Sequence, residues 1–306
     1  MSRILLIKHG SLGDIIFSLP VMNSIFIHKK NIKIDLLTED RYIKFLTKTN
    51  FFKKFLIDNR TNNLFITIIL LIKILGNKYD LIIDLQNSKR TSYYNLFFRL
   101  FSNVKICSSR KFSHIRYYIP EQGSESTTEG LFNQIKLINI PRYENSNYDW
   151  LKIDLDKIYH NKIVLFIPGT SKKGAYKQWQ ANKFAELASY CENKNYYICL
   201  IGTKADTLSV LPIIKNCKKI INNIDNSPPN KIFSIAKLSK LIVTNDTGPG
   251  HIAALSGSNI LWIVNNNKIT KANIGNRSYN FKVTAANVKD IKTKNVIKYI
   301  ENKNLL

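Results

Sequence analysis

Short apolar runs alternate with longer stretches of helical periodicity along the chain. In the first half, the apolar runs are short enough to be buried strands, and the stretches between them place apolar side chains three and four residues apart. The predicted strands span residues 4–8, 33–37, 55–57, 81–84 and 104–107. The predicted helices span residues 15–28, 40–47, 63–75 and 91–101. This order of elements predicts an α/β unit with a parallel sheet.

The same pattern restarts after a polar interruption. Beyond Pro120 the chain passes through a polar segment, a short helical stretch at 131–137 and a Pro-, Asn- and Tyr-rich stretch at 141–150. Later strands are predicted at 163–167, 197–201, 220–222, 241–244 and 260–264, and helices at 181–192, 207–215, 229–238 and 293–301. We therefore predict two Rossmann-like domains, residues 1–155 and 156–306, and expect the terminal helix either to stay with the second or to pack back on the first.

The net charge of the chain is compatible with several classes of partner and does not decide between them. The 306 residues include 46 Lys and Arg against 21 Asp and Glu, a formal net charge of +25. Nucleic acid, an anionic lipid surface and a phosphorylated substrate all fit such a charge. The lysines are spread along a chain that is also rich in Asn and Ile, with no Arg-rich tail and no RNA-binding signature. We therefore expect no nucleic-acid partner.

Cysteine spacing and the lengths of the apolar runs indicate the compartment. Cys107, Cys191, Cys199 and Cys217 show no CxxC spacing, which argues against structural zinc and a disulfide framework. We expect no leader, since the first residues already read as a strand. The longest apolar run, residues 64–75, is shorter than the roughly 20 residues that span a bilayer. These features predict a cytoplasmic protein, with peripheral membrane contact left open.

A first candidate group follows the first strand. The strand runs into a turn containing Ser11 and Gly13, and Asp14 follows at the start of a helix. An acid there is either a favourable first-turn residue, worth about 0.3 to 1 kcal/mol, or a base directed at a ligand. The turn matches neither the dinucleotide fingerprint GxGxxG nor a P-loop, which removes the main support for nicotinamide and NTPase functions.

A second candidate group follows the fourth strand of the first domain. Asp84, Gln86 and Arg90 place an acid, an amide and a base where that strand ends. Together they could bind sugar hydroxyls or acidic groups of an acceptor. The alternative is a polar strand end in which Asp84 caps the next helix.

A third group follows the first strand of the second domain. Gly169, Thr170 and Ser171 are small residues that allow close backbone approach, and Lys177 can neutralise a phosphate. Lys172 and Lys173 add charge to the same loop, and the alternative is a solvated loop with incidental lysines. Trp179 is expected to pack inside the domain.

A fourth group, NDTGPGH, follows a buried strand at 241–244. Asp246, Thr247 and Gly248 lie at the turn, and His251 opens a helix of small residues. The exposed amides of the turn and the helix dipole can hold a diphosphate. An isolated His is usually structural, but its position beside Asp246 favours contact with a ligand.

Taken together, these motifs resemble the bacterial heptosyltransferases of glycosyltransferase family 9, which transfer heptose from ADP-heptose to the lipopolysaccharide inner core. The resemblance rests on four elements in order: SLGDII with SLP, DLQ, PGTS with KQW, and NDTGPGH. It implies a GT-B fold of two Rossmann-like α/β/α domains facing a central cleft. The first domain would bind mainly the acceptor and the second the nucleotide sugar, with inversion at the anomeric carbon.

The resemblance also assigns roles to residues. Asp14 matches the general base. Acceptor contacts are expected at Ser11, Gly13, Asp84, Gln86 and Arg90, and donor contacts at Thr170, Ser171, Lys177, Asp246, Thr247, Gly248 and His251. No cofactor and no metal are expected, because a lysine and a helix N-terminus stabilise the departing diphosphate. The implied partners are ADP-heptose and an anionic lipid A-core acceptor, met at the cytoplasmic face of the inner membrane.

Three departures from the family pattern leave the donor's base and sugar open. Residues 265–270 read NNNKIT where the family usually carries a Gly-Pro-Thr-Asp-Pro type loop. Asn87 replaces the Gly after DLQ, and Gly250 replaces a bulkier residue. Two alternatives therefore stand beside heptosyl transfer: a GT-B transferase that uses another nucleotide sugar for a surface glycan, and a non-catalytic protein that binds polyanions.

Overall fold

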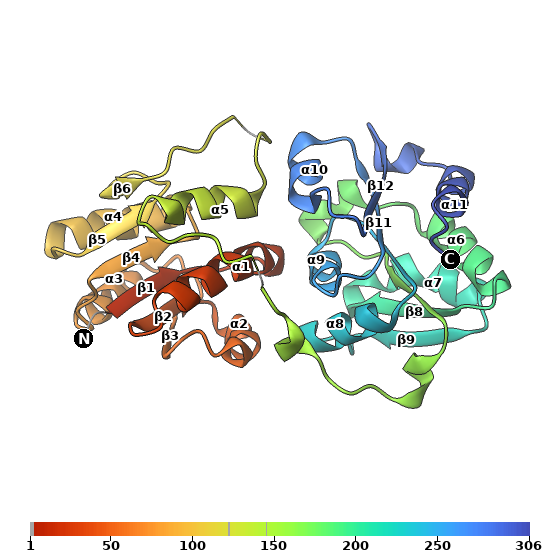
Figure 1. Ribbon diagram of the computed structural model, residues 1–306, viewed down its shortest axis with the longest axis horizontal. Coiled ribbons are helices and arrows are strands. Elements are labelled where there is room, and N and C mark those ends of the chain that lie inside the picture. Colours follow the sequence, from red (N-terminus) through yellow and green to blue (C-terminus); the bar gives the residue numbers. More distant parts are fainter. Residues whose placement is uncertain (1–2, 122, 145) are drawn as a thin grey trace. The chain divides into compact units, whose positions relative to one another are not determined.

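The chain forms two compact units, Met1–Asn147 and Tyr148–Leu306 (Figure 1). The computed structural model describes residues 3–121, 123–144 and 146–306. The division lies before the predicted one at 155 and 156, because residues 148–155 already attach to the second unit. Leu151 is fully buried, and the Ile153 N–H donates to Ser234 Oγ at 2.8 Å.

The first unit is a six-stranded parallel sheet in the order β3-β2-β1-β4-β5-β6. Its strands are β1 (Arg3–Ile7), β2 (Lys33–Thr38), β3 (Lys54–Ile57), β4 (Leu81–Asp84), β5 (Lys105–Ser108) and β6 (Ile115–Arg116). Its helices are α1 (Leu12–His28), α2 (Asp40–Leu46), α3 (Leu64–Leu75), α4 (Lys89–Phe101) and α5 (Thr127–Lys136), with a 3₁₀ turn at Thr47–Thr49.

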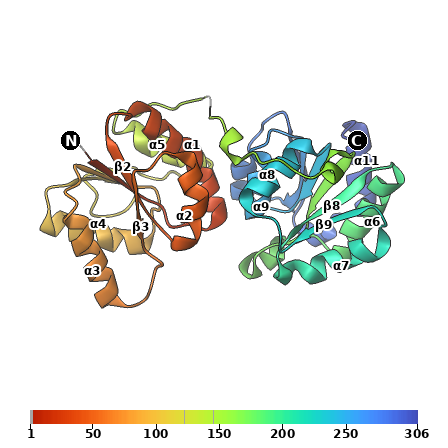
Figure 2. The same cartoon turned by 90° about the horizontal axis from the view of Figure 1, so that it is seen from below.

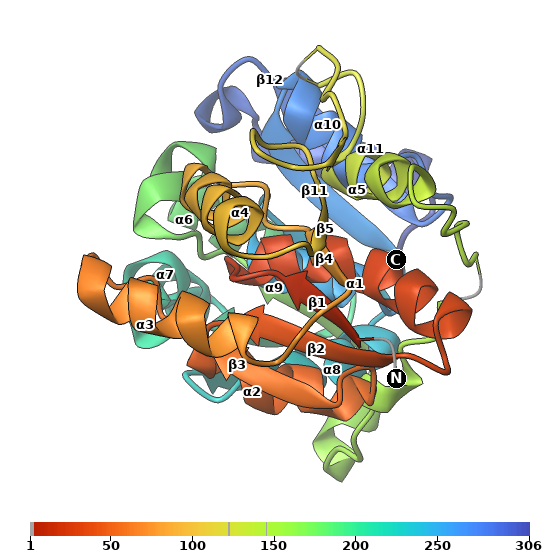
Figure 3. The ribbon, with the colours of Figure 1, turned by 90° about the vertical axis from the view of Figure 1, so that its left-hand side faces the viewer.

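Helices cover both faces of this sheet. On one face, α3 and α4 lie side by side (Figures 2 and 3), and their inward side chains form one core with β1 and its neighbours. Leu71 and Ile74 come from α3, Tyr94 and Phe98 from α4, and Leu5 from β1. On the other face, α5 packs against α1. The strands are buried on both sides, which explains their continuous apolar runs.

The second unit repeats this architecture with the order β12-β11-β10-β7-β8-β9. Its strands are β7 (Ile163–Ile167), β8 (Tyr197–Gly202), β9 (Ile220–Ile224), β10 (Leu241–Thr244), β11 (Ile260–Asn265) and β12 (Asn280–Ala285). Its helices are α6 (Ala181–Asn193), α7 (Thr207–Asn216), α8 (Pro229–Leu238), α9 (Gly248–Ala254), α10 (Lys268–Ile274) and α11 (Thr293–Asn302). Short 3₁₀ turns occupy Asp149–Leu151, Lys157–His160, Lys172–Lys177, Lys204–Asp206 and Val288–Asp290.

Both sheets have the strand order 3-2-1-4-5-6 when the strands are numbered within each unit. This is the Rossmann order, so the predicted pair of Rossmann-like domains is confirmed. In such sheets ligands bind at the carboxyl ends of the strands, where the order reverses. The reversal falls between β1 and β4 in the first unit, and between β7 and β10 in the second.

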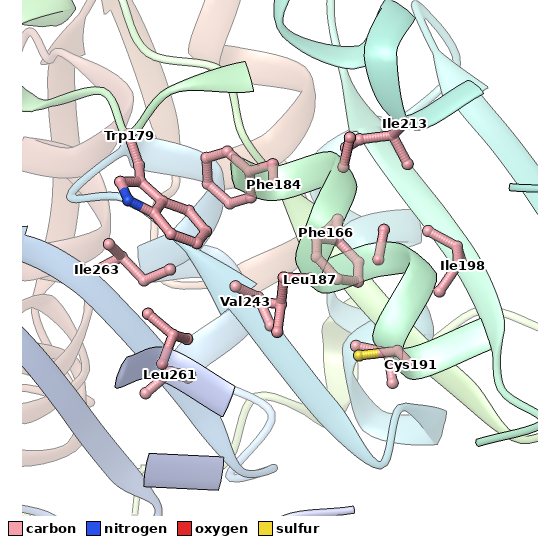
Figure 4. Packing of buried hydrophobic residues seen from close by; sticks show 14 of the residues in the cluster. Phe166, Trp179, Phe184, Leu187, Cys191, Ile198, Ile213, Val243, Leu261 and Ile263 are labelled. Atoms are coloured by element: carbon pink, nitrogen blue, oxygen red, sulfur yellow. The ribbon is translucent and has the colours of Figure 1, made fainter. Parts of the chain in front are cut away.

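Trp179 lies in the core of the second unit, as predicted (Figure 4). Its ring is fully buried and lies 4.9 Å from the Phe184 ring, centroid to centroid, and its indole N–H donates to the Ile291 carbonyl at 2.8 Å. The terminal helix α11 packs against α6 through Val296 and Ile300 in the same core. Its alternative contact with the first domain stays a prediction.

Several elements differ from the predicted ones. Helix α1 begins at Leu12, ahead of the predicted residue 15, because Ser11 caps it, and α5 begins at Thr127 because the Ser126 side chain accepts from the Glu129 N–H. The strands β6 and β12 and the helix α10 were not predicted, since their sequences are short or largely polar. In the described part of the chain, no helix is long and apolar enough to cross a membrane.

Candidate functional site

Asp14 lies in the first turn of α1, where its carboxylate belongs to a capping box. Oδ2 accepts from the Ser11 N–H at 2.7 Å and from the Ser11 hydroxyl at 3.1 Å. Among the described residues, none donates a hydrogen bond to Oδ1. The cap therefore occupies one carboxylate oxygen and fixes the side chain. The other oxygen remains available to accept a proton, so the general-base role stays a prediction.

The backbone before Asp14 approaches its neighbours closely. Gly10 has φ +122°, a conformation that favours glycine, and a Cβ there would lie 2.4 Å from the ring of Tyr42. Ser11 is exposed and Gly13 lies within the first helical turn. The tight turn thus carries the chain from the buried end of β1 directly into the first turn of α1.

Lys8 is a site residue that the sequence analysis missed. Its side chain is buried at the end of β1, and Nζ donates to the Leu85 carbonyl at 2.9 Å. Burial lowers the pKa of Lys8, whereas the nearby carboxylates of Asp14 and Asp84 oppose that shift. The signal in the sequence was a single lysine that ends an otherwise apolar strand. Lys8 lies close enough to Asp14 to interact with its charge.

Gln86 joins the two loops at the sheet's reversal point. Its Oε1 accepts from the His9 N–H at 3.1 Å and from the Gly10 N–H at 3.3 Å. A side chain from the loop after β4 thereby holds the loop after β1. The structure thus gives Gln86 a positioning role, and its direct contact with an acceptor stays a prediction.

Asp84 is fully buried and shapes the loop that follows it. Oδ1 accepts from the N–H groups of Gln86 and Asn87 at 3.0 and 2.9 Å, and Oδ2 accepts from the Ser108 hydroxyl at 3.1 Å. Burial raises the pKa of Asp84 even though these hydrogen bonds oppose the shift. Asn87 has φ 50°, a left-handed conformation that Asn tolerates well. Asp84 therefore holds the loop after β4, whereas Ser88 and not Asp84 caps the next helix; a direct acceptor contact by Asp84 stays a prediction.

Arg90 is held in a network beneath the same edge. Its NH2 donates to Asp58 Oδ1 at 3.1 Å, and its NH1 donates to the Thr61 carbonyl at 2.8 Å. Tyr94 donates to Asp58 Oδ2 at 2.6 Å, and Nε2 of the buried His9 lies 3.0 Å from the same oxygen. Burial opposes ionisation of Asp58, yet these partners keep its pKa below the usual range. An acceptor contact by Arg90 stays a prediction.

The second unit gathers its polar groups around Asp246, directly after β10. Lys177 Nζ donates to Asp246 Oδ2 at 2.7 Å, and His251 Nε2 lies 3.0 Å from Oδ1. The Thr270 hydroxyl donates to Oδ2 at 3.4 Å. Although burial opposes it, these contacts keep the pKa of Asp246 below its usual range, and Asp246 in turn raises the pKa of Lys177 against the effect of burial. In this cluster the Asp246 carboxylate is held in place and orients the partly exposed ammonium group of Lys177.

The loops at this second reversal point are also joined. The Asn245 amide donates to the Pro168 carbonyl at 2.8 Å and accepts from the Trp179 N–H at 3.1 Å. The loop after β7 therefore cannot move independently of the loop after β10. Asn245 is fully buried. In the sequence, only its position between the strand residue Thr244 and Asp246 indicated that it could join the two loops.

Helix α9 begins at Gly248, with Thr247 as its N-cap residue. Both are partly exposed. His251 is not at the start of the helix as expected but at its middle, the fourth of seven residues, buried, with its ring 4.9 Å from that of Trp262, centroid to centroid. Its imidazole therefore orients Asp246, and a direct ligand contact stays a prediction.

Thr170 and Ser171 begin the loop that leads to Lys177. The Thr170 hydroxyl donates to Gln178 Oε1 at 3.3 Å, and Ser171 is the exposed residue before the 3₁₀ turn. A Cβ at Gly169 would lie 2.2 Å from Asp206 Oδ1, so only glycine fits there. The side chains of Lys172 and Lys173 lie outside the described part of the chain.

Metal and thiol chemistry find little support. Among the described residues, no three His, Cys, Asp or Glu side chains lie close enough to hold a metal ion. The four cysteines are buried and unpaired, and burial raises the pKa of Cys107 and Cys199 to about 12. Such thiols are inert at neutral pH. The expectation that no metal is needed stays a prediction.

The chain is similar to known proteins in both sequence and structure. The sequence model described as glycosyltransferase family 9 (heptosyltransferase) matches residues 134–290. No curated protein sequence matches the chain. Among solved structures, the glycosyl transferase family 9 protein of Veillonella parvula is 16% identical, with a TM-score of 0.79, over 98% of this chain and 96% of that one.

Two further structures come from E. coli. The heptosyltransferase WaaC with ADP-2-deoxy-2-fluoro heptose is 14% identical, with a TM-score of 0.78, over 98% of this chain and 99% of that one. The ADP-heptose lps heptosyltransferase II is 15% identical, with a TM-score of 0.74, over 99% and 98%. At these identities the likeness shows the fold, and the predicted GT-B fold is confirmed.

Proposed function

The chain belongs to glycosyltransferase family 9, the heptosyltransferases, and from that premise we propose that it transfers heptose from ADP-heptose to a lipopolysaccharide inner-core acceptor with inversion. Asp14 is the general base of this reaction. The observation that carries the proposal is the capping box, which holds Asp14 at the reversal point of the first sheet with one oxygen left to accept a proton.

The acceptor step uses groups of the first unit. The acceptor hydroxyl gives its proton to Asp14 while its oxygen forms a bond to the anomeric carbon. Ser11 orients the carboxylate, Gln86 holds the preceding loop, and Lys8 lies close enough to interact with the charge of Asp14. These contacts fix the base before the acceptor arrives, so little reorganisation is needed during the reaction.

The donor step uses groups of the second unit. As the anomeric carbon takes on oxocarbenium character, its bond to the phosphate oxygen breaks and negative charge grows on the departing ADP. Lys177 offsets that charge, with Asp246 directing its ammonium group. The amides at Thr247 and Gly248, together with Thr170 and Ser171, would hold the diphosphate at the ends of β10 and β7.

The choice of ADP-heptose rests on the family and on the E. coli structures that hold ADP and ADP-2-deoxy-2-fluoro heptose. One observation favours a second candidate, a transferase that uses another nucleotide sugar. Residues 265–270 differ in sequence from the loop usual in the family, and here β11 extends to Asn265 and α10 begins at Lys268 with Asn267 as its cap. Thr270 of this helix contacts Asp246, so the altered segment lies beside the donor cluster.

Thermal shift and transfer assays test the proposal. ADP-heptose should raise the melting temperature more than UDP- and GDP-sugars do, because only a bound donor stabilises the folded state. It should also be consumed in the presence of a heptose-free inner-core acceptor. Preferential stabilisation by another nucleotide sugar would support the second candidate. Binding to nucleic acid that depends steeply on salt, without affinity for any nucleotide sugar, would point to the polyanion-binding alternative.

The acceptor also suggests a location. A lipid A-core acceptor is anchored in a membrane, so the enzyme would work at the cytoplasmic face of the inner membrane as a peripheral protein. Cell fractionation tests this: the protein should partly sediment with membranes and be released by high salt.

A further inference from the structure

Helix α3 exposes apolar side chains that nothing in the first unit covers. Thr67, Leu71 and Ile74 face the core, at the spacing of one helical stripe. The opposite side carries Phe65, Ile69 and Ile72, which are 71, 50 and 56% exposed. Leu64, Ile66 and Ile68 are exposed as well. A helix that is apolar all round is normally buried, so this one needs a partner outside its own unit.

The apolar surface continues onto α4, which lies beside α3 (Figures 2 and 3). Tyr93 and Leu100 are two helical turns apart on the outward side of α4, and Phe101 follows at its end. All three are more than half exposed. Exposed apolar side chains therefore occur on two neighbouring helices rather than on α3 alone.

The chain segment that carries α3 and α4 has mostly basic exposed charges. In residues 53–105 the only exposed acidic side chain is Asp80. The exposed basic side chains in the same segment are Lys53, Lys54, Arg60, Lys73, Lys78, Lys89, Arg99 and Lys105. Lys73 lies on α3 itself, next to Ile72. An apolar helix face bordered by lysines is the pattern of a helix that lies in the interface of an anionic membrane.

We propose that α3 is a membrane-docking helix that inserts its Phe65, Ile69 and Ile72 face into the headgroup region of an anionic bilayer. The helix has 12 residues and is about 18 Å long, so it can lie in the interface but cannot span the apolar core of about 30 Å. Two copies of this chain meeting at the face would bring like charges together, which disfavours self-association.

The inference deepens the proposed function and rests on it for the membrane partner. Docking through α3 would keep the enzyme at the surface that holds its acceptor. The experiment must distinguish a failure of membrane docking through α3 from a failure of the proposed heptosyl transfer. Lipid binding is therefore the direct readout, and donor binding is followed in the same variants.

The test is flotation of the full-length protein with vesicles. Vesicles of phosphatidylglycerol and phosphatidylethanolamine should bind it at least about tenfold better than phosphatidylcholine vesicles, and high salt should weaken the binding. The triple variant Phe65→Gln, Ile69→Gln, Ile72→Gln should lose at least about tenfold of that binding, because the apolar insertion is gone. Lys73→Glu should weaken it as well.

A matched control removes exposed apolar side chains from the second unit: Leu208→Gln, Ile214→Gln and Leu238→Gln. This control should float like the wild type. Melting temperature and the thermal shift with ADP should be unchanged in both triple variants, so a failed donor assignment would not affect the readout. Equal flotation of the α3 variant and the wild type would overturn the proposal. A concentration-dependent dimer that the α3 substitutions abolish, without vesicle binding, would assign the face to a second copy instead.

Discussion

Replacing Asp14 by Asn separates the two things that the carboxylate does. The amide oxygen can still accept from the Ser11 N–H, so the local cap is largely kept. What disappears is the negative charge in the first turn of α1, worth about 0.3 to 1 kcal/mol of stability. The proton acceptor disappears with it. The variant should therefore fold, bind donor normally and fail in transfer.

The magnitudes make the outcome decisive. General-base catalysis contributes about 10²- to 10⁴-fold in rate, which corresponds to about 3 to 5 kcal/mol in the activation free energy. A loss of about 1 kcal/mol in stability leaves an ordinary domain almost fully folded. Turnover of Asp14→Asn should therefore fall at least about a hundredfold, while its melting temperature changes by a few degrees.

The assay is single-turnover transfer, followed alongside calorimetric binding of donor. A matched control is Ser126→Ala, which removes another N-cap of the same unit, where the Ser126 side chain accepts from the Glu129 N–H at 3.1 Å. That variant should lose a similar amount of stability and keep its turnover. Near wild-type turnover in Asp14→Asn, or an equal loss in Ser126→Ala, would refute the assignment of Asp14 as the base.

Three further predictions concern the second unit. Lys177→Met should weaken ADP binding about tenfold or more in calorimetry, and Lys177→Arg should restore part of it, because the ammonium paired with Asp246 also offsets phosphate charge. His251 and Lys177 hold the pKa of Asp246 below its usual range, so the carboxylate stabilises the fold at pH values above its unfolded-state pKa near 4, and this stabilisation is lost as the pH falls further. Asp246→Asn should therefore flatten the dependence of melting temperature on pH between about 5 and 2. Gly250→Ala should lower the melting temperature at a cost of about 1 to 3 kcal/mol, since the new Cβ would lie 2.7 Å from Thr244 Oγ1 and 3.1 Å from the Trp262 ring; an unchanged melting temperature would show that these side chains can move aside.

Most of the fold could be predicted because its strands are buried on both faces. β1, β7 and β10 are apolar runs that end at polar loops, and such runs are visible without any structure. β12 is only partly buried and mixes polar with apolar residues, and α10 has a largely polar sequence. Neither pattern differs enough from a loop, so packing rather than local periodicity decides these elements.

The candidate site was predictable to a different degree in each unit. Lys177 and Asp246 are both in conspicuous motifs, and the structure pairs them. In the first unit, the residue types pointed to Asp84 and Arg90 as ligand contacts; the structure shows both in hydrogen bonds that support the loops, and their contact with an acceptor stays a prediction. Asp58 was missed altogether. Its importance comes from contacts with residues 30 and more positions away, which no local pattern contains.

Two departures from the family pattern concern single residues: Asn87 stands where the family has glycine, and Gly250 stands where it has a bulkier residue. Asn87 keeps the left-handed conformation that a glycine would adopt, and it adds a hydrogen bond from its amide to Gln134 Oε1 at 2.7 Å. Gly250 leaves room for the Trp262 ring, and that ring in turn packs on His251. Both residues therefore fit the backbone found at the reversal points of the sheets. The segment 265–270 carries a larger change of sequence, and in this chain it contains the end of β11 and the start of a helix beside Asp246. A change of donor should therefore depend first on Thr270 and its neighbours, whereas the roles proposed for Asp14 and Lys177 do not depend on which nucleotide sugar is bound.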